Sequence, residues 1–288
     1  MTAKVTAFAP AKINLTLHVT GRRADGYHLL DSLVAFTDIG DEITAVPAPK
    51  TSLIVSGPMS EGVPTDASNL VVQAAHLLGP NKSASLHLTK VLPPASGIGG
   101  GSSDAAATLR ALSKLWDVPL PAPQETVSLG ADLPVCLRPL AQRMSGIGEE
   151  LTLLPSLPPC DILLVNPGVH VATPSIFKAL TSRDNPPMPQ ELPAWNSVQE
   201  LAEWLKAQRN DLEQPAITLA PVIAKVLEAL AGTEALFSRM SGSGATCFAL
   251  FPEACPAIEK VAQEINANNP DWWVQTGKLI HLAETTPG

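Results

Sequence analysis

Apolar positions in the first third of the chain recur in short runs that predict β-strands. These runs cover residues 4–9 and 12–19, on either side of Pro10, and then residues 29–36, 42–46, 52–56 and 85–90. Residues 66–78 follow helical spacing instead, because their apolar positions recur three and four residues apart, and Asp66 or Ser68 can cap the start. This part of the chain therefore predicts a sheet accompanied by one helix.

Helices and strands interleave beyond residue 93. The spacing predicts helices over 102–116, 174–180, 217–231 and 256–267, and strands over 161–166, 235–240 and 246–251. This order lacks the regular strand–helix–strand alternation of a doubly wound sheet, which favours an α+β fold. The proline-rich run 155–159 predicts a boundary between two domains, 1–155 and 156–288. We expect residues 185–193 to form a mobile loop.

The composition supports a large core and narrows the class of protein. Hydrophobic residues make up 45% of the 288 positions and charged residues 16%, against about 25% in typical soluble domains. These values exclude disordered, collagen-like and coiled-coil chains. The net charge of −8 argues against nucleic acid or a membrane surface as a partner. Because every apolar run is shorter than a membrane-spanning helix, we expect a cytoplasmic protein. We further expect it to be a monomer or a homodimer.

The cysteines add no metal site or disulfide framework. Cys136, Cys160, Cys247 and Cys255 are separated by 24, 87 and 8 positions. These gaps lack the short paired spacing of a zinc site, and four cysteines are too few for a disulfide scaffold in a chain of this length. We expect reduced thiols.

The glycine-rich stretch PPASGIGGGSSDAAATL, residues 93–109, carries the clearest chemical signal. Glycines let backbone N–H groups approach a bulky anion, and the helix expected to follow them offers unpaired N–H donors and a partial positive charge. The stretch is neither a Walker A loop nor a clean GxGxxG, because Ser102 holds the last glycine position. It predicts a phosphate site. The alternative is a flexible loop capped by Ser102 or Ser103.

Two charged residues could act together with a phosphate site. Lys12 lies at the start of an apolar strand, and Asp132 follows a glycine in GADLP, residues 130–134. An aspartate can accept the proton of an attacking hydroxyl while a lysine stabilises developing charge. Taken singly, Lys12 could be an exposed edge lysine and Asp132 a turn or cap residue.

Two further segments are candidates for ligand binding. Tyr27, the one tyrosine of the chain, precedes His28 in a polar loop, where the pair offers a flat stacking face and ring nitrogens. The alternative is a loop tyrosine packed on the domain edge. The stretch MSGSGAT, residues 240–246, could be a hairpin turn or a second glycine loop that closes over phosphates.

Together these segments resemble the small-molecule kinases named for galactokinase, homoserine kinase, mevalonate kinase and phosphomevalonate kinase. The matching stretches are PAKINL at 10–15, GRRADGYH at 21–28, the loop at 97–106, LGAD at 129–132 and MSGSGA at 240–245. The DGYH and AKIN segments are similar to the corresponding segments of those family members that phosphorylate an alcohol carrying a cytidine diphosphate. The resemblance implies a domain like the second domain of ribosomal protein S5, followed by a ferredoxin-like domain.

The resemblance also implies roles for individual residues, with ATP and Mg²⁺ as cofactors. Asp132 would be the general base and Lys12 would orient the nucleophile. Tyr27 and Phe177 would stack on the cytosine, His28 would read it, and Asn14 and Thr173 would contact the alcohol. Residues implied on the ATP side are Asn69, Lys90, Pro94, Ala95, Ser96, Gly97, Ile98, Gly99, Gly100, Gly101, Ser102, Ser103 and Asp104. The second glycine loop comprises Ser241, Gly242, Ser243 and Gly244.

Three other functions stay open at this point. One is a kinase of the same superfamily that acts on homoserine or mevalonate, although the DGYH segment argues against it. Another is a non-catalytic ligand-binding or regulatory protein on the same fold, which the presence of both Lys12 and Asp132 disfavours. The last is an RNA-binding protein, which the net charge disfavours.

Overall fold

The computed structural model describes residues 3–281 and divides them into two units. Unit 1 comprises the segments up to residue 12, 40–95 and 99–139. Unit 2 comprises 13–39, 96–98 and the described residues from 140 onward. The chain therefore passes between the units inside strand β1 (Val5–Asn14) and near the middle of strand β3 (His28–Pro47). The boundary between domains 1–155 and 156–288, expected from the proline-rich run, stays a prediction.

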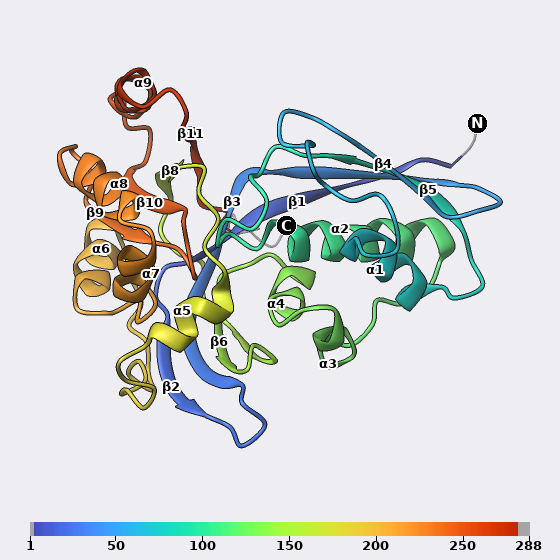
Figure 1. Cartoon of the computed structure of the whole chain (residues 1–288), viewed down its shortest axis with the longest axis horizontal. Helices are drawn as coiled ribbons and strands as arrows, with labels where there is room; N and C mark the ends of the chain where they lie inside the picture. The colour runs from blue at the N-terminus through green and yellow to red at the C-terminus, as the bar shows by residue number, and fades with distance from the viewer. Residues whose placement is uncertain (1–2, 282–288) are drawn as a thin grey trace, which may run out of the picture. The chain divides into compact units, whose positions relative to one another are not determined.

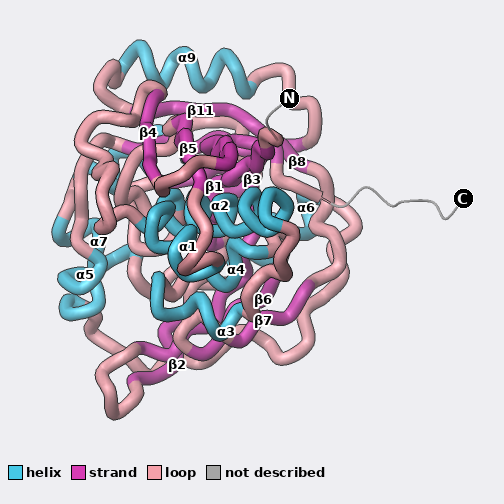
Figure 2. Tube along the Cα trace, turned by 90° about the vertical axis from the view of Figure 1, so that its right-hand side faces the viewer, coloured by secondary structure: helices cyan, strands magenta, loops and turns pink. Residues whose placement is uncertain are grey.

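Unit 1 is a sheet covered by two helices. Strand β5 (Ala84–Thr89) pairs antiparallel with the second half of β3 and parallel with β4 (Ser52–Ser56). Helices α1 (Leu70–Leu78) and α2 (Gly100–Trp116) lie side by side (Figure 2). Their apolar residues form one core with the sheet, including Ile43, Leu86, Leu88, Val71 and Leu112. Alternation in the strands and helical spacing in α1 and α2 direct these side chains inward.

Short helices complete unit 1 after α2. They are α3 (Pro123–Thr126), the 3₁₀ turn Val127–Leu129 and α4 (Leu133–Leu137). Arg110 on α2 fixes α4, because its guanidinium donates to Cys136 O at 2.8 Å and also to Phe8 O at 2.7 Å. The loop that carries Asp132 is therefore held between α2 and the N-terminal strand.

Unit 2 contains the other part of the large sheet and a four-stranded sheet. Around the first half of β3 lie β2 (His18–Arg22), β6 (Gln142–Gly146) and β7 (Glu150–Leu153), each pairing antiparallel with its neighbour. The second sheet has the order β11-β8-β10-β9 (Figure 1), with bounds Trp273–Lys278, Cys160–Asn166, Cys247–Pro252 and Phe237–Met240. Its helices are α5 (Thr173–Ala179), α6 (Val198–Lys206), α7 (Glu213–Leu219), α8 (Val222–Ala231) and α9 (Ile258–Asn268).

The predicted α+β class is confirmed, and most predicted elements are found within a few residues of their expected bounds. Two predicted strand breaks are wrong. The first strand continues through Pro10, which is tolerated because, among the described residues, β1 pairs with β3 alone and a proline fits an edge strand. Strand β3 continues through Gly40 and Asp41 instead of breaking there. Residue 40 needs to be glycine, because a β-carbon at this position would collide with Ala9 O and the Phe8 ring.

The second half of the chain also departs from the predicted elements. The helix expected over 217–231 is two helices, α7 and α8, because Pro221 cannot continue the first and starts the second. The spacing of apolar residues did not predict three helices and three strands that the structure contains: α3, α4, α6, β6, β7 and β11. Within residues 3–281, no helix has both the length and the apolar character needed to cross a bilayer.

Candidate functional site

Lys12 and Asp132 form an ion pair in unit 1. Lys12 Nζ lies 2.9 Å from Asp132 Oδ2, with the lysine side chain 3% exposed and the aspartate side chain 37% exposed. The interpretation of Lys12 as an exposed edge lysine is therefore wrong. Asp132 stands at the N-cap position of α4 but makes no side-chain cap bond, because its carboxylate is directed to Lys12 instead. The pair presents a partly exposed carboxylate beside a buried ammonium.

The first turn of α2 approaches this ion pair. Gly99 precedes the helix with a φ of +63°, a left-handed conformation that glycine adopts without strain. A β-carbon at Gly99 would lie 3.1 Å from Lys12 Cε and 3.9 Å from Asp132 Oδ2. Because the first N–H groups of a helix have no intrahelical partner, they offer donors and a positive dipole end to an anion. In unit 1 a helix terminus with unpaired N–H donors thus lies next to a carboxylate.

The two serines after the glycines do not cap this helix, so the capped-loop interpretation is wrong. Helix α2 begins at Gly100, two residues earlier than predicted, with Gly99 as its cap. Ser103 Oγ is buried and donates to Pro10 O at 2.7 Å, which ties α2 to β1. Ser102 is half-buried, and its Oγ would lie 3.6 Å from a β-carbon at Gly130. Ser102 is therefore the serine of the two that a bound phosphate or cation could reach.

Asn69 and Lys90, which the resemblance places near adenine, have structural partners in unit 1. Asn69 caps α1 by accepting from Val71 N at 2.9 Å and donates to Pro64 O at 2.6 Å. Lys90 is buried in an ion cluster with Asp41 and Asp104. Their part in nucleotide binding stays a prediction, as does that of Pro94 and Ala95, which lie in an exposed turn before the loop.

The ion cluster of Lys90, Asp41 and Asp104 lies next to Gly100, the first residue of α2. Lys90 Nζ contacts Asp41 and lies 2.9 Å from Asp104 Oδ2, while Asp41 Oδ1 accepts from Leu92 N at 2.8 Å. A β-carbon at Gly100 would lie 3.2 Å from Lys90 Nζ. Burial raises the pKa of Asp104 to about 8, and the neighbouring Lys90 opposes this shift. Sequence reasoning missed Asp41, although an aspartate inside an apolar strand was a usable signal.

A second group of predicted residues gathers in unit 2, around residues 241–244. Ser241 Oγ accepts from Asn14 N at 3.0 Å and donates to Gly97 O at 3.1 Å. Asn14 Nδ2 donates to Ser32 Oγ at 2.7 Å, and its Oδ1 would lie 3.0 Å from a β-carbon at Gly242. The Thr173 and Ser243 hydroxyls are 2.9 Å apart. Asn14, Thr173 and the second glycine loop therefore form one polar cluster with Gly97.

The close approach of Gly97 to the second glycine loop gives a testable prediction. Gly97 has a φ of +79°, and a β-carbon there would lie 2.6–2.7 Å from Ser241 O and from Gly244 N and O. We expect Gly97→Ala to lower the free energy of unfolding by more than the about 1–2 kcal/mol that a left-handed non-glycine residue costs. Urea denaturation measures the change. Gly62→Ala is the matched control, because Gly62 has a φ of +73° and no atom within 4 Å. Equal losses in the two variants would contradict the steric argument.

Of the predicted cytosine-binding residues, two lie on elements of unit 2 and Tyr27 lies in the loop before β3. His28 begins β3, and its ring stacks on Phe177 of α5 with centroids 4.5 Å apart and planes 18° apart. His28 Nε2 is buried and has no hydrogen-bond partner among the described residues. Burial lowers the pKa of His28, so the ring is neutral at physiological pH. Tyr27 is 59% exposed, which contradicts the alternative of a tyrosine packed on the domain edge.

The described residues fit the phosphates of ATP better than a metal cage made of protein. They contain no cluster of three or more His, Cys, Asp or Glu side chains placed to hold an ion, and all four cysteines are free. Magnesium is usually bound by one or two protein oxygens together with substrate phosphates and water. The Ser102 hydroxyl and the Asp132 carboxylate supply oxygens of that kind beside the α2 terminus.

Known proteins that are similar to this chain identify its family. Residues 69–137 match the model of the GHMP kinases N terminal domain, and residues 190–271 match that of the GHMP kinases C terminal. A 4-diphosphocytidyl-2-C-methyl-D-erythritol kinase from Ruegeria pomeroyi is 54% identical over 96% of this chain and 99% of its own. One from Cereibacter sphaeroides is 56% identical over 95% of this chain and 99% of its own.

Solved structures point to the same kinase family. The crystal structure of a 4-(cytidine 5'-diphospho)-2C-methyl-D-erythritol kinase superposes with a TM-score of 0.77 and 31% identity, covering 95% of this chain and 98% of that one. The L. major mevalonate kinase, solved in complex with R-mevalonate, has a TM-score of 0.67 at 16% identity over 98% and 97% of the two chains, and so shares the fold. The chain belongs to the 4-diphosphocytidyl-2-C-methyl-D-erythritol kinases, within the GHMP kinases.

Proposed function

We propose that this kinase of isoprenoid synthesis transfers the γ-phosphoryl group of ATP to the 2-hydroxyl of 4-diphosphocytidyl-2-C-methyl-D-erythritol. The observation that carries the proposal is the Lys12–Asp132 pair beside the first turn of α2. The names of the relatives support the substrate. The chain retains both charged residues, which favours a kinase over a non-catalytic binding protein.

In the proposed reaction Asp132 accepts the proton of the 2-hydroxyl as the oxygen attacks the γ-phosphorus. The bond between that phosphorus and the bridging oxygen of the β-phosphate breaks, and ADP leaves. Lys12, held 2.9 Å from Asp132, orients the nucleophile and balances its charge. The N–H groups of Gly100 and Gly101 at the start of α2 hold phosphate oxygens. Ser102 and Asp132 would hold Mg²⁺, which would neutralise part of the phosphate charge when bound.

The residues of unit 2 hold the other end of the substrate in this proposal. Tyr27 and Phe177 stack on the cytosine, and the free Nε2 of His28 hydrogen-bonds to its polar edge. Entry of the base requires the His28 ring to leave its stack on Phe177. Asn14 and Thr173, which flank the second glycine loop, contact the methylerythritol hydroxyls.

Replacement of Tyr27 tests the stacking role. Base–aromatic stacking contributes about 1–3 kcal/mol, so we expect Tyr27→Ala to raise KM for the cytidylylated substrate about 5- to 150-fold with a smaller change in kcat. Because Tyr27 is exposed, the variant should fold normally. Tyr27→Phe keeps the ring and should keep KM. Steady-state ADP release at saturating ATP measures both, and an unchanged KM in Tyr27→Ala would remove the stacking role.

A substrate panel tests the function as a whole. Coupled ADP release is compared for the cytidylylated methylerythritol, homoserine and mevalonate at equal concentrations. We expect turnover with the first alone. Turnover with homoserine or mevalonate instead would assign another activity of the superfamily, and no turnover with any alcohol would favour a binding protein.

The proposal also covers the setting in which the enzyme works. We place it in the cytoplasm as a monomer or homodimer, since its substrates are soluble metabolites. Nucleic acid is not expected as a partner, because the chain carries a net charge of −8. Salt-sensitive retention of RNA near physiological ionic strength would contradict this.

A further inference from the structure

Two arginines of unit 2 lie beside the stacked rings of His28 and Phe177, and the proposed reaction gives neither of them a role. The first, Arg22, ends β2 and pairs with His28 in the antiparallel ladder of β2 and β3. Residues paired in this way project from the same face of a sheet. The Arg22 guanidinium is bound to the turn before Tyr27, since its Nε donates to Gly26 O at 3.2 Å. Arg22 is therefore on the face from which the His28 ring projects.

The second arginine, Arg183, contacts the helix that carries Phe177. Its Nη2 donates to Lys178 O at 3.1 Å, and Lys178 follows Phe177 directly in α5. The Phe177 and His28 rings are stacked with their centroids 4.5 Å apart. Burial lowers the pKa of His28, and the positive charges of Arg22 and Arg183 lower it further. Both guanidinium groups are thus close enough to act on the ring that is proposed to read the base.

Acidic side chains do not neutralise these two arginines. Among the described residues neither guanidinium forms an ion pair with a carboxylate, whereas the neighbouring Arg23 pairs with Asp25 at 2.8 Å. Within the same part of the chain each donates one hydrogen bond, to a carbonyl oxygen, so most of its five N–H donors stay available. Arg22 is exposed and Arg183 half-buried, so a dissolved ligand can reach both. The two groups offer charge and donors to an anion.

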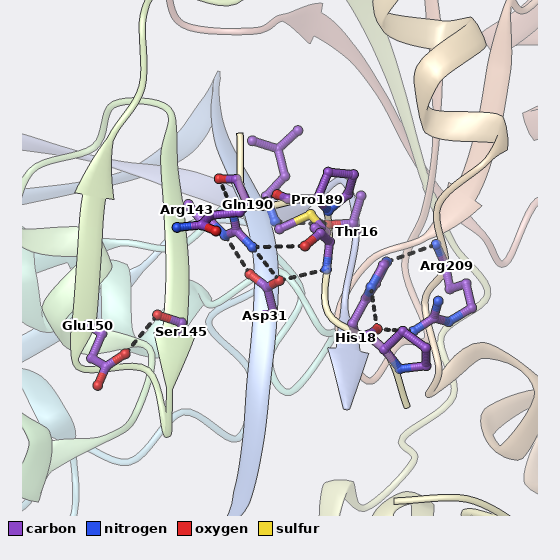
Figure 3. A network of polar contacts seen from close by, with 12 residues as sticks. Thr16, His18, Asp31, Arg143, Ser145, Glu150, Pro189, Gln190 and Arg209 are labelled. Atoms are coloured by element: carbon purple, nitrogen blue, oxygen red, sulfur yellow. Dashed lines mark hydrogen bonds and ion pairs between the residues drawn. The ribbon is translucent and has the colours of Figure 1, made fainter. Parts of the chain in front are cut away.

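The chain that follows Arg183 is anchored, although we expected a mobile loop there. Asn185 donates to Val19 O on β2 twice, from its backbone N at 3.2 Å and from Nδ2 at 3.1 Å. Arg143 on β6 then donates to the carbonyl oxygens of residues 188–190 at 2.8–3.2 Å (Figure 3). Arg183 is therefore held between α5 and a fixed segment. A site that is ordered before binding loses less conformational entropy when its ligand arrives.

We propose that Arg22 and Arg183 bind the diphosphate of the cytidylylated substrate and so favour it over uncharged cytidine. This inference rests on the proposed function, in which the cytosine lies at Tyr27, His28 and Phe177. One ribose separates a cytosine from its first phosphate, so a base at these rings brings phosphate oxygens to the side chains that border them. The planar donors of a guanidinium match phosphate oxygens in pairs. In the proposed function the phosphates of ATP are bound elsewhere, at the start of α2 in unit 1.

Equilibrium binding of cytidine, CMP and CDP to the full chain separates the phosphates from the base. Titration calorimetry is carried out with Mg²⁺ and a saturating non-hydrolysable ATP analogue, so that none of the three ligands enters the ATP site. We expect Arg22→Gln and Arg183→Gln each to weaken CDP binding about tenfold and cytidine binding less than about twofold, because cytidine lacks the phosphates. The double variant should bind CDP about as weakly as it binds cytidine. The loss for CMP shows which arginine contacts the first phosphate.

Three further variants separate a specific contact from loss of charge and from loss of structure. Lys260→Gln removes one charge from α9 of the same unit, where the lysine side chain is 79% exposed, and should leave all three affinities unchanged. Arg22→Lys and Arg183→Lys keep the charge but lose the paired donors, so each should recover part of the tenfold loss. An arginine with a merely structural role would weaken cytidine and CDP by the same factor, which would overturn the proposal.

Failure of this proposal and failure of the proposed function give different results. If the original chain binds cytidine and CDP equally, or if both arginine-to-glutamine variants behave like Lys260→Gln, these arginines do not bind the diphosphate. Turnover of the cytidylylated substrate would then still support the proposed function. If the original chain binds neither cytidine nor CDP and does not turn the substrate over, the base site itself is wrong, and the diphosphate site is overturned with it.

Discussion

Replacing Asp132 with asparagine is expected to lower kcat for the cytidylylated substrate by about 10²–10⁴-fold, the range that general-base catalysis supplies. The amide keeps the size of the side chain and an oxygen that Lys12 can contact, but it cannot take a proton from the attacking hydroxyl. Because Asp132 supplies a counter-charge to the buried Lys12, we expect the replacement to lower the free energy of unfolding as well. Coupled ADP release measures kcat, and urea denaturation verifies the fold.

Asp117→Asn is the matched control for this variant. Asp117 is an exposed aspartate of the same unit with a φ of 52°, a conformation that asparagine also tolerates. Its kcat should equal that of the original chain. If Asp132→Asn folds and turns over at a near-normal rate, Asp132 is not the base, and another acceptor for the hydroxyl proton must be sought.

Replacing Lys90 with methionine is expected to lower the free energy of unfolding by about 3–5 kcal/mol. Lys90 is the shared cation of Asp41 and Asp104, and the side chains of all three residues are buried. Removing the ammonium leaves the Asp41 carboxylate with backbone amide donors but without a counter-charge. The loss should therefore exceed that of a typical surface substitution several-fold, as measured by urea denaturation at pH 7.

Asp104→Asn separates this effect from loss of packing. Burial raises the pKa of Asp104 to about 8, which favours the neutral acid that asparagine resembles. We expect a loss below about 1 kcal/mol. A loss as large as that of Lys90→Met would mean that Asp104 is ionised in the folded protein. A Lys90→Met protein within about 1 kcal/mol of the original would contradict the role of the ion cluster.

The glycine loop could be predicted from the sequence because local spacing carries it, whereas Lys12 and Asp132 are far apart in the chain and were linked through their joint use beside a phosphate site and through the family resemblance. Glycine density followed by a helix defines an anion site, and a lysine and an aspartate near such a site have an evident joint use. The partners of Lys90 could not be predicted in the same way. Asp41 is 49 residues away in the chain, and its pairing depends on the register of β3 with β5.

The same limit applies to residues 185–193. Prolines and the absence of periodic spacing correctly predicted irregular backbone there. The segment is fixed by side chains from elsewhere, above all Arg143, which binds the carbonyl oxygens of residues 188–190. Every residue has a backbone carbonyl, so the sequence does not show which carbonyls accept a hydrogen bond from Arg143. Sequence alone therefore could not distinguish an anchored segment from a mobile one.

The passage of the chain between units has a consequence for how this protein can be divided. The chain changes unit after residues 12, 39, 95, 98 and 139. A single cleavage or gene fission therefore cannot separate the two units, since the half lacking residues 13–39 would lose β2 and the part of β3 with which β6 pairs. Such a split gives two fragments that must recombine, and function should return on mixing both halves rather than from either one.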